Sequence, residues 1–152
     1  MEDTLNCLAT SIEDYISNGG DFKEISHIIE TYTGKDWINY IDNHTQGLNK
    51  NRVYLSSNIE ILILSWKSNY KTLPHDHSKN GCWLKVLKGS LSETLYNHNF
   101  NLTCKSIIYQ GDISFMSNDI GYHSIANETE NTTFSIHIYS PPLHKTKYYN
   151  ID

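Results

Sequence analysis

The sequence predicts a mainly β protein, an antiparallel β-barrel or sandwich preceded by a small N-terminal helical segment. Up to about residue 41, apolar residues recur every three or four positions, as on one face of a helix. After Arg52 they alternate or form short continuous runs, which is typical of strands. The connections between these runs are too brief for crossover helices, so antiparallel pairing is favoured. A chain of 152 residues predicts one domain, in which residues 1–41 pack as helices on a barrel over residues 52–142.

The N-terminal segment is expected to contain two helices and a short turn. The first helix covers residues 5–16 and ends at the glycine pair that follows. The second covers residues 22–32, with Asp21 as its N-cap. A further helical turn is expected around Trp37, and the polar residues 42–51 are expected to form a linker.

The strands are expected where β-branched, aromatic and leucine side chains form runs of five to eight residues. No internal repeat suggests a solenoid or a propeller. The clearest strands cover residues 59–66, 83–87, 102–109 and 133–139.

Composition and charge exclude several classes of partner. The mean hydropathy is −0.51, and no stretch approaches the roughly 20 apolar residues that cross a bilayer, so no membrane span is expected. The formal net charge is −5 without a basic cluster, which argues against nucleic acid as a partner. The three cysteines are an odd number and the acidic start lacks a secretory segment, so a reducing, cytoplasmic location is expected. The expected partner is a small molecule, and the expected state is a monomer.

The most informative short segment is Pro74-His75-Asp76-His77, which follows a predicted strand. On an extended backbone, residues two apart point to the same side, so His75 and His77 can direct both imidazoles at one point. This spacing suits a metal ion, although two surface histidines in a polar loop are an equal alternative on spacing alone. His123 is the best candidate for a third ligand.

The strand predicted at residues 133–139 has two different faces. Phe134, Ile136 and Ile138 form an apolar face, which we expect to pack against a core. The other face carries Ser135, His137 and Tyr139, and either faces solvent or lines a polar cavity. In a cavity, His137 could pass a hydrogen bond to the phenol of Tyr139 and fix its orientation.

Arg52 is the only arginine among 12 basic residues. Where either cation would serve this chain uses lysine, so the arginine suggests a site that needs a planar fork, such as one that pairs with a carboxylate. An ordinary surface arginine is the alternative.

Taken together, residues 52–142 resemble the cysteine dioxygenase family of the cupin superfamily. The cupin pattern of two histidines, a ligand-type position and a glycine is present as His75, His77, Cys82 and Gly89, with cysteine where most cupins carry glutamate. Lys50 departs from the family, because relatives often carry tyrosine two residues before the arginine. The segments that carry the resemblance are LILSW (62–66), HDH (75–77), GCWLKVLKGSLSETLY (81–96), DIGYH (119–123) and SIHIYSPP (135–142).

The resemblance implies a cupin jelly roll with one non-haem Fe(II) bound by His75, His77 and His123. It implies an enzyme that oxidises L-cysteine to cysteine sulfinate with both atoms of O2. Three neutral imidazoles leave the full dipositive charge on the metal, and that charge favours an anionic thiolate as a further ligand.

The resemblance also implies roles for five residues near the metal. Cys82 and Tyr139 match the pair that forms a cysteine–tyrosine thioether in many relatives, although a small buried hydrophobe is the commoner fate of a free cysteine. Arg52 matches the residue that holds the substrate's carboxylate. Tyr139 would act in catalysis and substrate binding by donating a hydrogen bond toward the bound oxygen or the carboxylate. Ser135 and His137 would support Tyr139, and the Ser140–Pro141 bond would be cis in this family.

Two alternatives remain open. The substrate could be another small thiol carboxylate such as 3-mercaptopropionate, although relatives of that type usually have glutamine at the position of the arginine. The protein could instead be a non-catalytic cupin that binds a metal or a metabolite.

Overall fold

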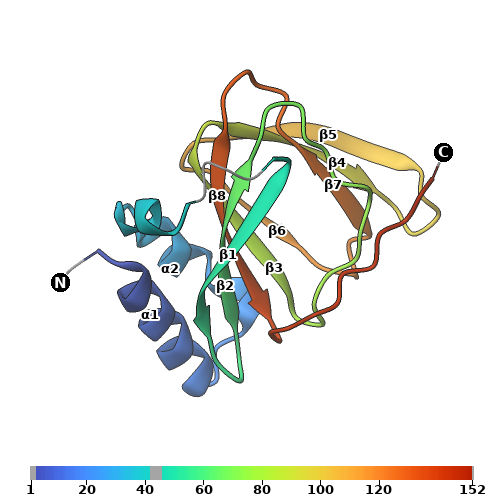
Figure 1. The fold of residues 1–152 in the computed structure, drawn as a ribbon. Coiled ribbons are helices and arrows are strands. Elements are labelled where there is room, and N and C mark those ends of the chain that lie inside the picture. Colours follow the sequence, from blue (N-terminus) through green and yellow to red (C-terminus); the bar gives the residue numbers. More distant parts are fainter. Residues whose placement is uncertain (1–2, 42–45, 152) are drawn as a thin grey trace.

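The computed structural model describes residues 3–41 and 46–151, which form two antiparallel sheets and a group of short helices (Figure 1). The larger sheet has the strand order β1-β2-β8-β3-β6, and the smaller one has the order β5-β4-β7. The strands are β1 (Leu48–Leu55), β2 (Glu60–Trp66), β3 (Gly81–Lys88), β4 (Ser90–Tyr96), β5 (Leu102–Tyr109), β6 (Ile113–Met116), β7 (Tyr122–Ala126) and β8 (Thr133–Ser140).

This architecture confirms the predicted class, mainly antiparallel β with a small helical part. The strands expected at 102–109 and 133–139 are β5 and β8, the latter one residue longer. Strand β1 begins at Leu48, so residues 48–51 of the segment expected as a linker belong to a strand. Residues 42–45 of that segment lie outside the described residues. The Ser140–Pro141 bond is cis, as the resemblance implied.

The helices are α1 (Leu5–Ser17), the 3-10 turn η1 (Phe22–Glu24), α2 (Ser26–Thr31) and the 3-10 turn η2 (Asp36–Tyr40). The second predicted helix is therefore divided in two. Asp21 caps it as expected, but its side chain accepts from the Lys23 amide only two residues on, which begins a tight turn. In the described part of the chain, no helix combines the length and the apolar character needed to cross a bilayer.

Two hydrophobic cores lie on opposite faces of the larger sheet. The outer face of β2 and β8 packs against the N-terminal helices, and this core contains Phe134, Ile136 and Ile138 from the apolar face predicted for β8. The second core lies between the two sheets and includes Leu64, Leu84, Val86, Leu91, Ile108 and Ile125. Because successive side chains of a strand point to opposite faces, the polar residues of β8 are directed between the sheets.

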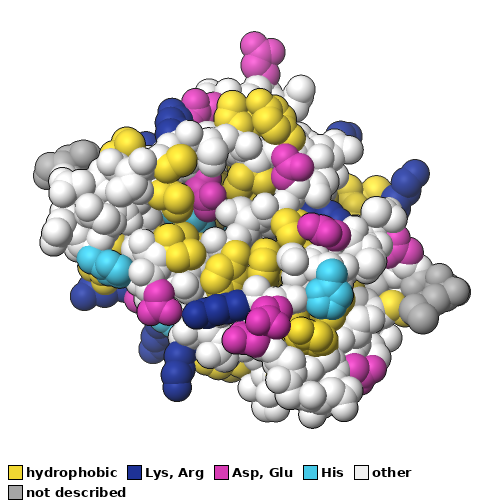
Figure 2. All heavy atoms as spheres, turned by 180° about the vertical axis from the view of Figure 1, so that it is seen from behind, with side chains coloured by type: hydrophobic (Ala, Val, Ile, Leu, Met, Phe, Trp, Pro, Cys, Tyr) yellow, Lys and Arg dark blue, Asp and Glu magenta, His cyan; other side chains and the backbone are white. Residues whose placement is uncertain are grey.

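The surface visible in Figure 2 carries no broad patch of one kind. On that face, lysine and arginine side chains are scattered among acidic and apolar ones. The face shown in Figure 2 therefore has no concentrated positive charge.

Candidate metal centre

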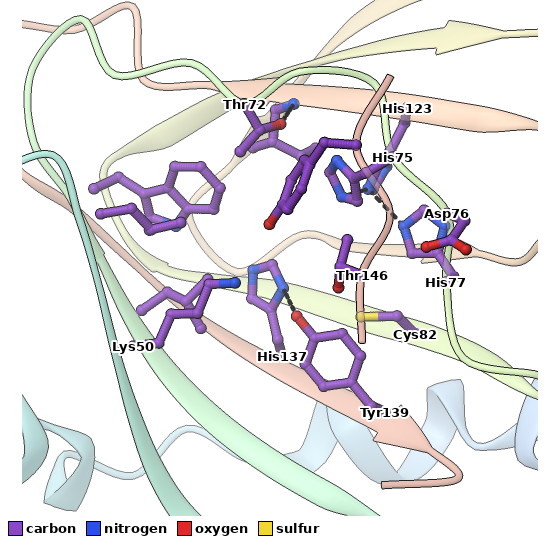
Figure 3. A pocket seen from close by; sticks show the side chains of 15 residues that line it. Lys50, Thr72, His75, Asp76, His77, Cys82, His123, His137, Tyr139 and Thr146 are labelled. Carbon is purple, nitrogen blue, oxygen red and sulfur yellow. Dashed lines mark hydrogen bonds between the residues drawn. The ribbon is translucent and has the colours of Figure 1, made fainter. Parts of the chain in front are cut away.

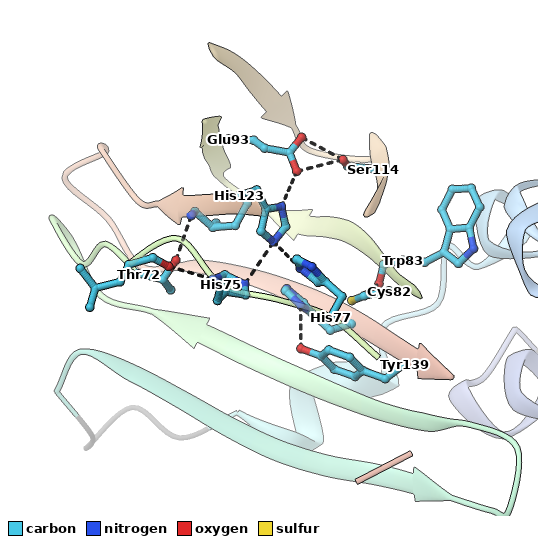
Figure 4. Close-up of polar contacts among 12 residues, drawn as sticks. Thr72, His75, His77, Cys82, Trp83, Glu93, Ser114, His123 and Tyr139 are labelled. Atoms are coloured by element: carbon cyan, nitrogen blue, oxygen red, sulfur yellow. Dashed lines mark hydrogen bonds and ion pairs between the residues drawn. The ribbon is translucent and has the colours of Figure 1, made fainter. Parts of the chain in front are cut away.

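Three imidazoles from separate parts of the chain meet between the sheets (Figure 4). His75 and His77 lie in the segment between β2 and β3, and His123 lies in β7. A backbone hydrogen bond from the His75 amide to the His123 carbonyl, 3.1 Å long, holds the two segments together. The Nε2 atom of His123 lies 2.9 Å from that of His77 and 3.1 Å from that of His75. Among the described residues, these three form the group that could hold a metal ion.

The geometry and chemistry of these nitrogens fit a metal. Two imidazole nitrogens that each lie roughly 2.1 Å from one metal ion, at an angle of about 90° at the metal, are about 3 Å apart. The Nε2 distances in this centre agree with that separation. The Nδ1 atom of His75 lies 2.9 Å from the Leu73 carbonyl, and that of His123 lies 2.8 Å from a Glu93 oxygen. Since both partners accept hydrogen bonds, each Nδ1 carries the proton and each Nε2 keeps its lone pair for the shared point.

The three rings are held in the neutral form. Burial is the largest cause that lowers the pKa of His75, His77 and His123, and the neighbouring imidazoles lower the pKa of His77 and His123 further. Neutral imidazole is the form that binds a metal, so these rings do not need to lose a proton first.

Glu93 is a part of this centre that the sequence analysis missed. Its carboxylate is buried in β4, and one oxygen accepts the hydrogen bond from His123 while Ser114 donates to both oxygens, at 2.9 and 3.2 Å. Burial raises the pKa of Glu93, and the Ser114 hydroxyl opposes that rise. A usable signal existed in the sequence, because Glu93 stands between Leu91 and Leu95 on one face of a strand.

Cys82 and Tyr139 are directly opposite each other on the paired strands β3 and β8. Such partners have Cβ atoms roughly 5 Å apart on the same face of a sheet. Burial raises the pKa of the Cys82 thiol to about 12, and it also raises the pKa of the Tyr139 phenol. Both side chains therefore carry their protons at neutral pH.

A chain of hydrogen bonds runs along the polar face of β8 toward Tyr139. The Trp66 indole donates to the Ser135 hydroxyl at 2.8 Å, Ser135 lies 3.0 Å from His137 Nε2, and His137 Nδ1 lies 3.3 Å from the Tyr139 oxygen. This face of β8 was predicted to face solvent or to line a polar cavity, and in the structure it lines a polar cavity. Burial lowers the pKa of His137, which keeps the ring neutral.

The three histidines, Cys82, His137 and Tyr139 line one pocket, whose empty space including its mouth is about 420 Å³ (Figure 3). Asp76 directs its carboxylate at the C-terminal segment, where Oδ1 accepts from the Lys147 amide at 2.7 Å. This pairing places Thr146 and Tyr148 over the pocket as part of its wall.

Arg52 does not line this pocket. Its side chain is 48% exposed and lies 3.5 Å from Glu60 in an ion pair at the rim. Lys50, two residues earlier on the same face of β1, lines the pocket. The assignment of Arg52 to the substrate's carboxylate stays a prediction.

Comparison with known proteins agrees with this arrangement. The family model described as cysteine dioxygenase type I matches residues 3–151. The cysteine dioxygenase type 1 of Danio rerio is 24% identical over 162 residues, which cover 94% of this chain and 81% of the relative. The Homo sapiens cysteine dioxygenase type 1 is 25% identical over 131 residues, which cover 80% of this chain but only 66% of the human protein.

Solved structures with similar folds are cupins. A Klebsiella pneumoniae protein with a double-stranded β-helix domain superposes with a TM-score of 0.62 at 13% identity, over 76% of this chain and 89% of that one. A cupin superfamily protein from Desulfitobacterium hafniense gives a TM-score of 0.54 at 13% identity, over 66% of this chain and 83% of that one. At this identity the likeness shows the double-stranded β-helix fold and nothing finer.

Proposed function

This chain belongs to the cysteine dioxygenase type I family, and from that membership we propose that it oxidises L-cysteine to cysteine sulfinate with O2. The proposed cofactor is one non-haem Fe(II) held by His75, His77 and His123. The observation that carries the proposal is the convergence of three neutral imidazoles, with Nε2 atoms 2.9 and 3.1 Å apart, in a pocket that also contains Cys82 and Tyr139.

The iron would supply a positive centre that binds the thiol as thiolate and activates O2 beside it. The protein's own contribution begins with two of the ligands, His75 and His123, whose tautomers are fixed by Leu73 and Glu93. No carboxylate belongs to the ligand group found among the described residues, so the ligands cancel none of the metal's charge. An anionic sulfur is the ligand that such a centre favours.

Tyr139 is proposed to donate a hydrogen bond into the pocket. Ser135 accepts from Trp66, so its own hydroxyl proton is available for His137 Nε2. His137 Nδ1 then carries the ring's proton and donates a hydrogen bond to the Tyr139 oxygen. The phenol's O–H, which interacts with the Cys82 thiol in this structure, is proposed to turn toward the substrate when it binds. Through this chain His137 and Ser135 would act as positioning residues for Tyr139.

Cys82 and Tyr139 are further proposed to form a thioether during turnover. A bond between Sγ and the ring carbon next to the phenol's hydroxyl would release two hydrogens, with O2 as the oxidant. The direct pairing of the two residues across β3 and β8 supports this proposal. The linkage would fix the phenol in the position that the hydrogen-bond chain also favours.

The C-terminal segment is proposed to limit the entry of water. Thr146 and Tyr148 lie in the pocket's wall, and the Tyr148 ring lies 5.4 Å from the His75 ring, centroid to centroid. Exclusion of water strengthens the electrostatic interactions of the site.

We also propose a cytoplasmic location and a monomeric state. Cys7, Cys82 and Cys104 are free thiols in the structure, which is the usual condition in a reducing compartment. Sedimentation of the purified protein would measure the oligomeric state.

Oxygen consumption by the Fe(II)-loaded protein tests the reaction. We expect uptake with L-cysteine and a product 32 mass units heavier, and we expect His123→Ala to abolish both iron retention and uptake. Faster oxidation of 3-mercaptopropionate than of L-cysteine would identify 3-mercaptopropionate as the substrate in place of L-cysteine. No uptake with any thiol at full iron loading would favour a non-catalytic metal-binding cupin.

A further inference from the structure

His77 differs from the other two histidines of the centre in what lies behind its ring. His75 is oriented through Nδ1 by the Leu73 carbonyl. His123 is oriented in the same way by Glu93. The Nδ1 atom of His77 is buried, and no atom of the described residues forms a hydrogen bond with it. The direction of the His77 imidazole therefore depends more strongly on how its backbone is held, because the backbone sets the direction of the Cα–Cβ bond.

Asn118 holds the backbone of His77 by both of its polar groups. The His77 amide donates to Asn118 Oδ1 at 2.9 Å, and Asn118 Nδ2 donates to the His77 carbonyl at 3.0 Å. Two residues that face each other in an antiparallel sheet can exchange a pair of hydrogen bonds in the same way. The side-chain amide of Asn118 thus takes the place of a partner strand for this one residue.

The fold explains why a side chain is needed at this point. The backbone of His75 pairs with that of His123 in β7. In an extended antiparallel pairing of this register, the residue opposite His77 would be Gly121. The chain has already left the strand there, since Gly121 has a φ of 133° and precedes the first residue of β7. Asn118, in the turn just before, supplies the donor and the acceptor that β7 does not.

The turn that carries Asn118 is itself fixed. It joins β6 to β7, and the Ile120 amide donates to the Ser117 carbonyl at 3.1 Å. From the connection between β4 and β5, His98 Nε2 donates to the Asn118 carbonyl at 2.6 Å. Because this turn leads directly into the strand of His123, Asn118 connects the strand of one ligand to the backbone of another.

We propose that Asn118 is a positioning residue of the metal centre, which sets the placement of His77 relative to His123 by clamping the backbone of His77. This inference rests on the proposed function, since it concerns the ligands of the same metal. Asparagine suits the role because its short side chain carries both a donor and an acceptor, whereas an ionised aspartate only accepts. Asn118 lies outside the wall of the pocket, so its effect on the metal passes through His77.

The test is metal binding measured without turnover. Co(II) is titrated into the metal-free protein against a chelator in the absence of O2, and the d–d absorption of bound Co(II) reports the geometry of its ligands. Asn118→Ala removes both hydrogen bonds, Asn118→Asp keeps only the acceptor, and Asn118→Gln keeps the amide on a longer side chain. Asn18→Ala is the control, because the Asn18 amide also donates to a backbone carbonyl, that of Asp14 at the end of α1.

Asn118→Ala should weaken Co(II) binding about tenfold, as expected for a group that supports a metal ligand, and should change the d–d spectrum at saturating Co(II). Asn118→Asp should bind no more tightly than Asn118→Ala, since its second oxygen would face the His77 carbonyl. Asn118→Gln should retain more affinity than either, and Asn18→Ala should match the parent in affinity and spectrum.

Several results would overturn the role of Asn118. One is an Asn118→Ala protein with the parent's affinity and spectrum. Another is an equal loss of affinity in Asn18→Ala, which would show a general effect of stability. The comparison of Asn118→Asp with Asn118→Gln stands on its own if Asn118→Ala does not fold, and equal affinities in that pair would also contradict the proposal.

The two proposals fail in different ways. A parent protein that binds Co(II) with the expected dependence on Asn118 yet consumes no O2 when loaded with Fe(II) would refute the proposed reaction alone. A parent that oxidises thiols while Asn118→Ala binds Co(II) equally well and with the same spectrum would refute only the role of Asn118.

Discussion

The metal-free protein should be unusually sensitive to mild acid. Four histidines surround one pocket, three of them buried and His75 partly buried, and burial lowers the pKa of each of them: His75, His77, His123 and His137. In the unfolded chain the same side chains titrate at about 6.5. Below that pH the unfolded state binds more protons than the folded state, so the free energy of unfolding falls as the pH falls.

The size of the effect follows from the number of rings. A histidine that stays neutral in the folded state contributes a loss of about 1.2 kcal/mol between pH 7 and pH 5.5, given an unfolded pKa of about 6.5. Four such rings set an upper limit of roughly 5 kcal/mol, a large part of the 5–15 kcal/mol typical of a folded domain. Near pH 5.5 the slope should correspond to at most about 3.6 protons taken up on unfolding, since the pKa of His75 is lowered against an opposing hydrogen bond to Leu73.

Urea denaturation of the chelator-treated protein at several pH values would measure this slope. The matched control is His137→Gln, which removes one buried ring outside the metal ligands and should lower the uptake by about one proton. An uptake below one proton in the parent, or an unchanged slope in His137→Gln, would refute the reasoning. Added metal should oppose the acid effect, because the ion and the protons compete for the same nitrogens.

Four further predictions concern single contacts. Glu93→Gln should lower metal affinity about 10- to 100-fold in a chelator competition, because it weakens the hydrogen bond that orients His123; an unchanged affinity would contradict that role. Lys85→Met should reduce the free energy of unfolding, measured by urea denaturation, by about 2–3 kcal/mol. The reason is that the buried ammonium donates to three carbonyl oxygens, two of them at 2.7 and 3.0 Å. A loss under about 0.5 kcal/mol would contradict this prediction. Asp76→Ala should speed amide hydrogen exchange in residues 143–149 and leave β8 unchanged, because Asp76 accepts from the backbone of that segment; equal exchange in both proteins would show that other contacts hold it. After many turnovers the parent's intact mass should be two hydrogens below the sequence mass and that of Cys82→Ser should show no deficit; an unshifted parent would count against the thioether.

The elements that the sequence predicted well are those in which a periodic pattern coincides with burial on one side. Strand β8 is the clearest case, because the alternation of Phe134, Ile136 and Ile138 with polar residues fixes which face meets the helices. The first helix has the same kind of pattern and was predicted to within one residue of its observed end, Ser17. In both cases local spacing carries the information.

Pairing across the sheets carries information that spacing does not. The histidines at 75 and 77 were recognisable from their separation of two, but the approach of His123 depends on a backbone hydrogen bond between β7 and a distant loop. The same holds for Glu93, whose partner lies 30 residues away on a neighbouring strand. Long-range register of this kind follows from the whole fold.

Arg52 shows a different limit. Its rarity in the composition indicated a special role, and the role at the substrate's carboxylate stays a prediction. The sequence could not show that Arg52 stands opposite Leu62 with Glu60 3.5 Å away, because these neighbours become visible only when β1 and β2 are paired.

The charge behind the imidazoles suits a bound cation. Glu93 lies behind His123, on the side away from the shared point of the imidazoles, where its negative charge stabilises a bound cation. Glu93 is not a member of the ligand group found among the described residues, so it supports the cation without taking a coordination position. The coordination positions that the three imidazoles leave open are therefore available to further ligands.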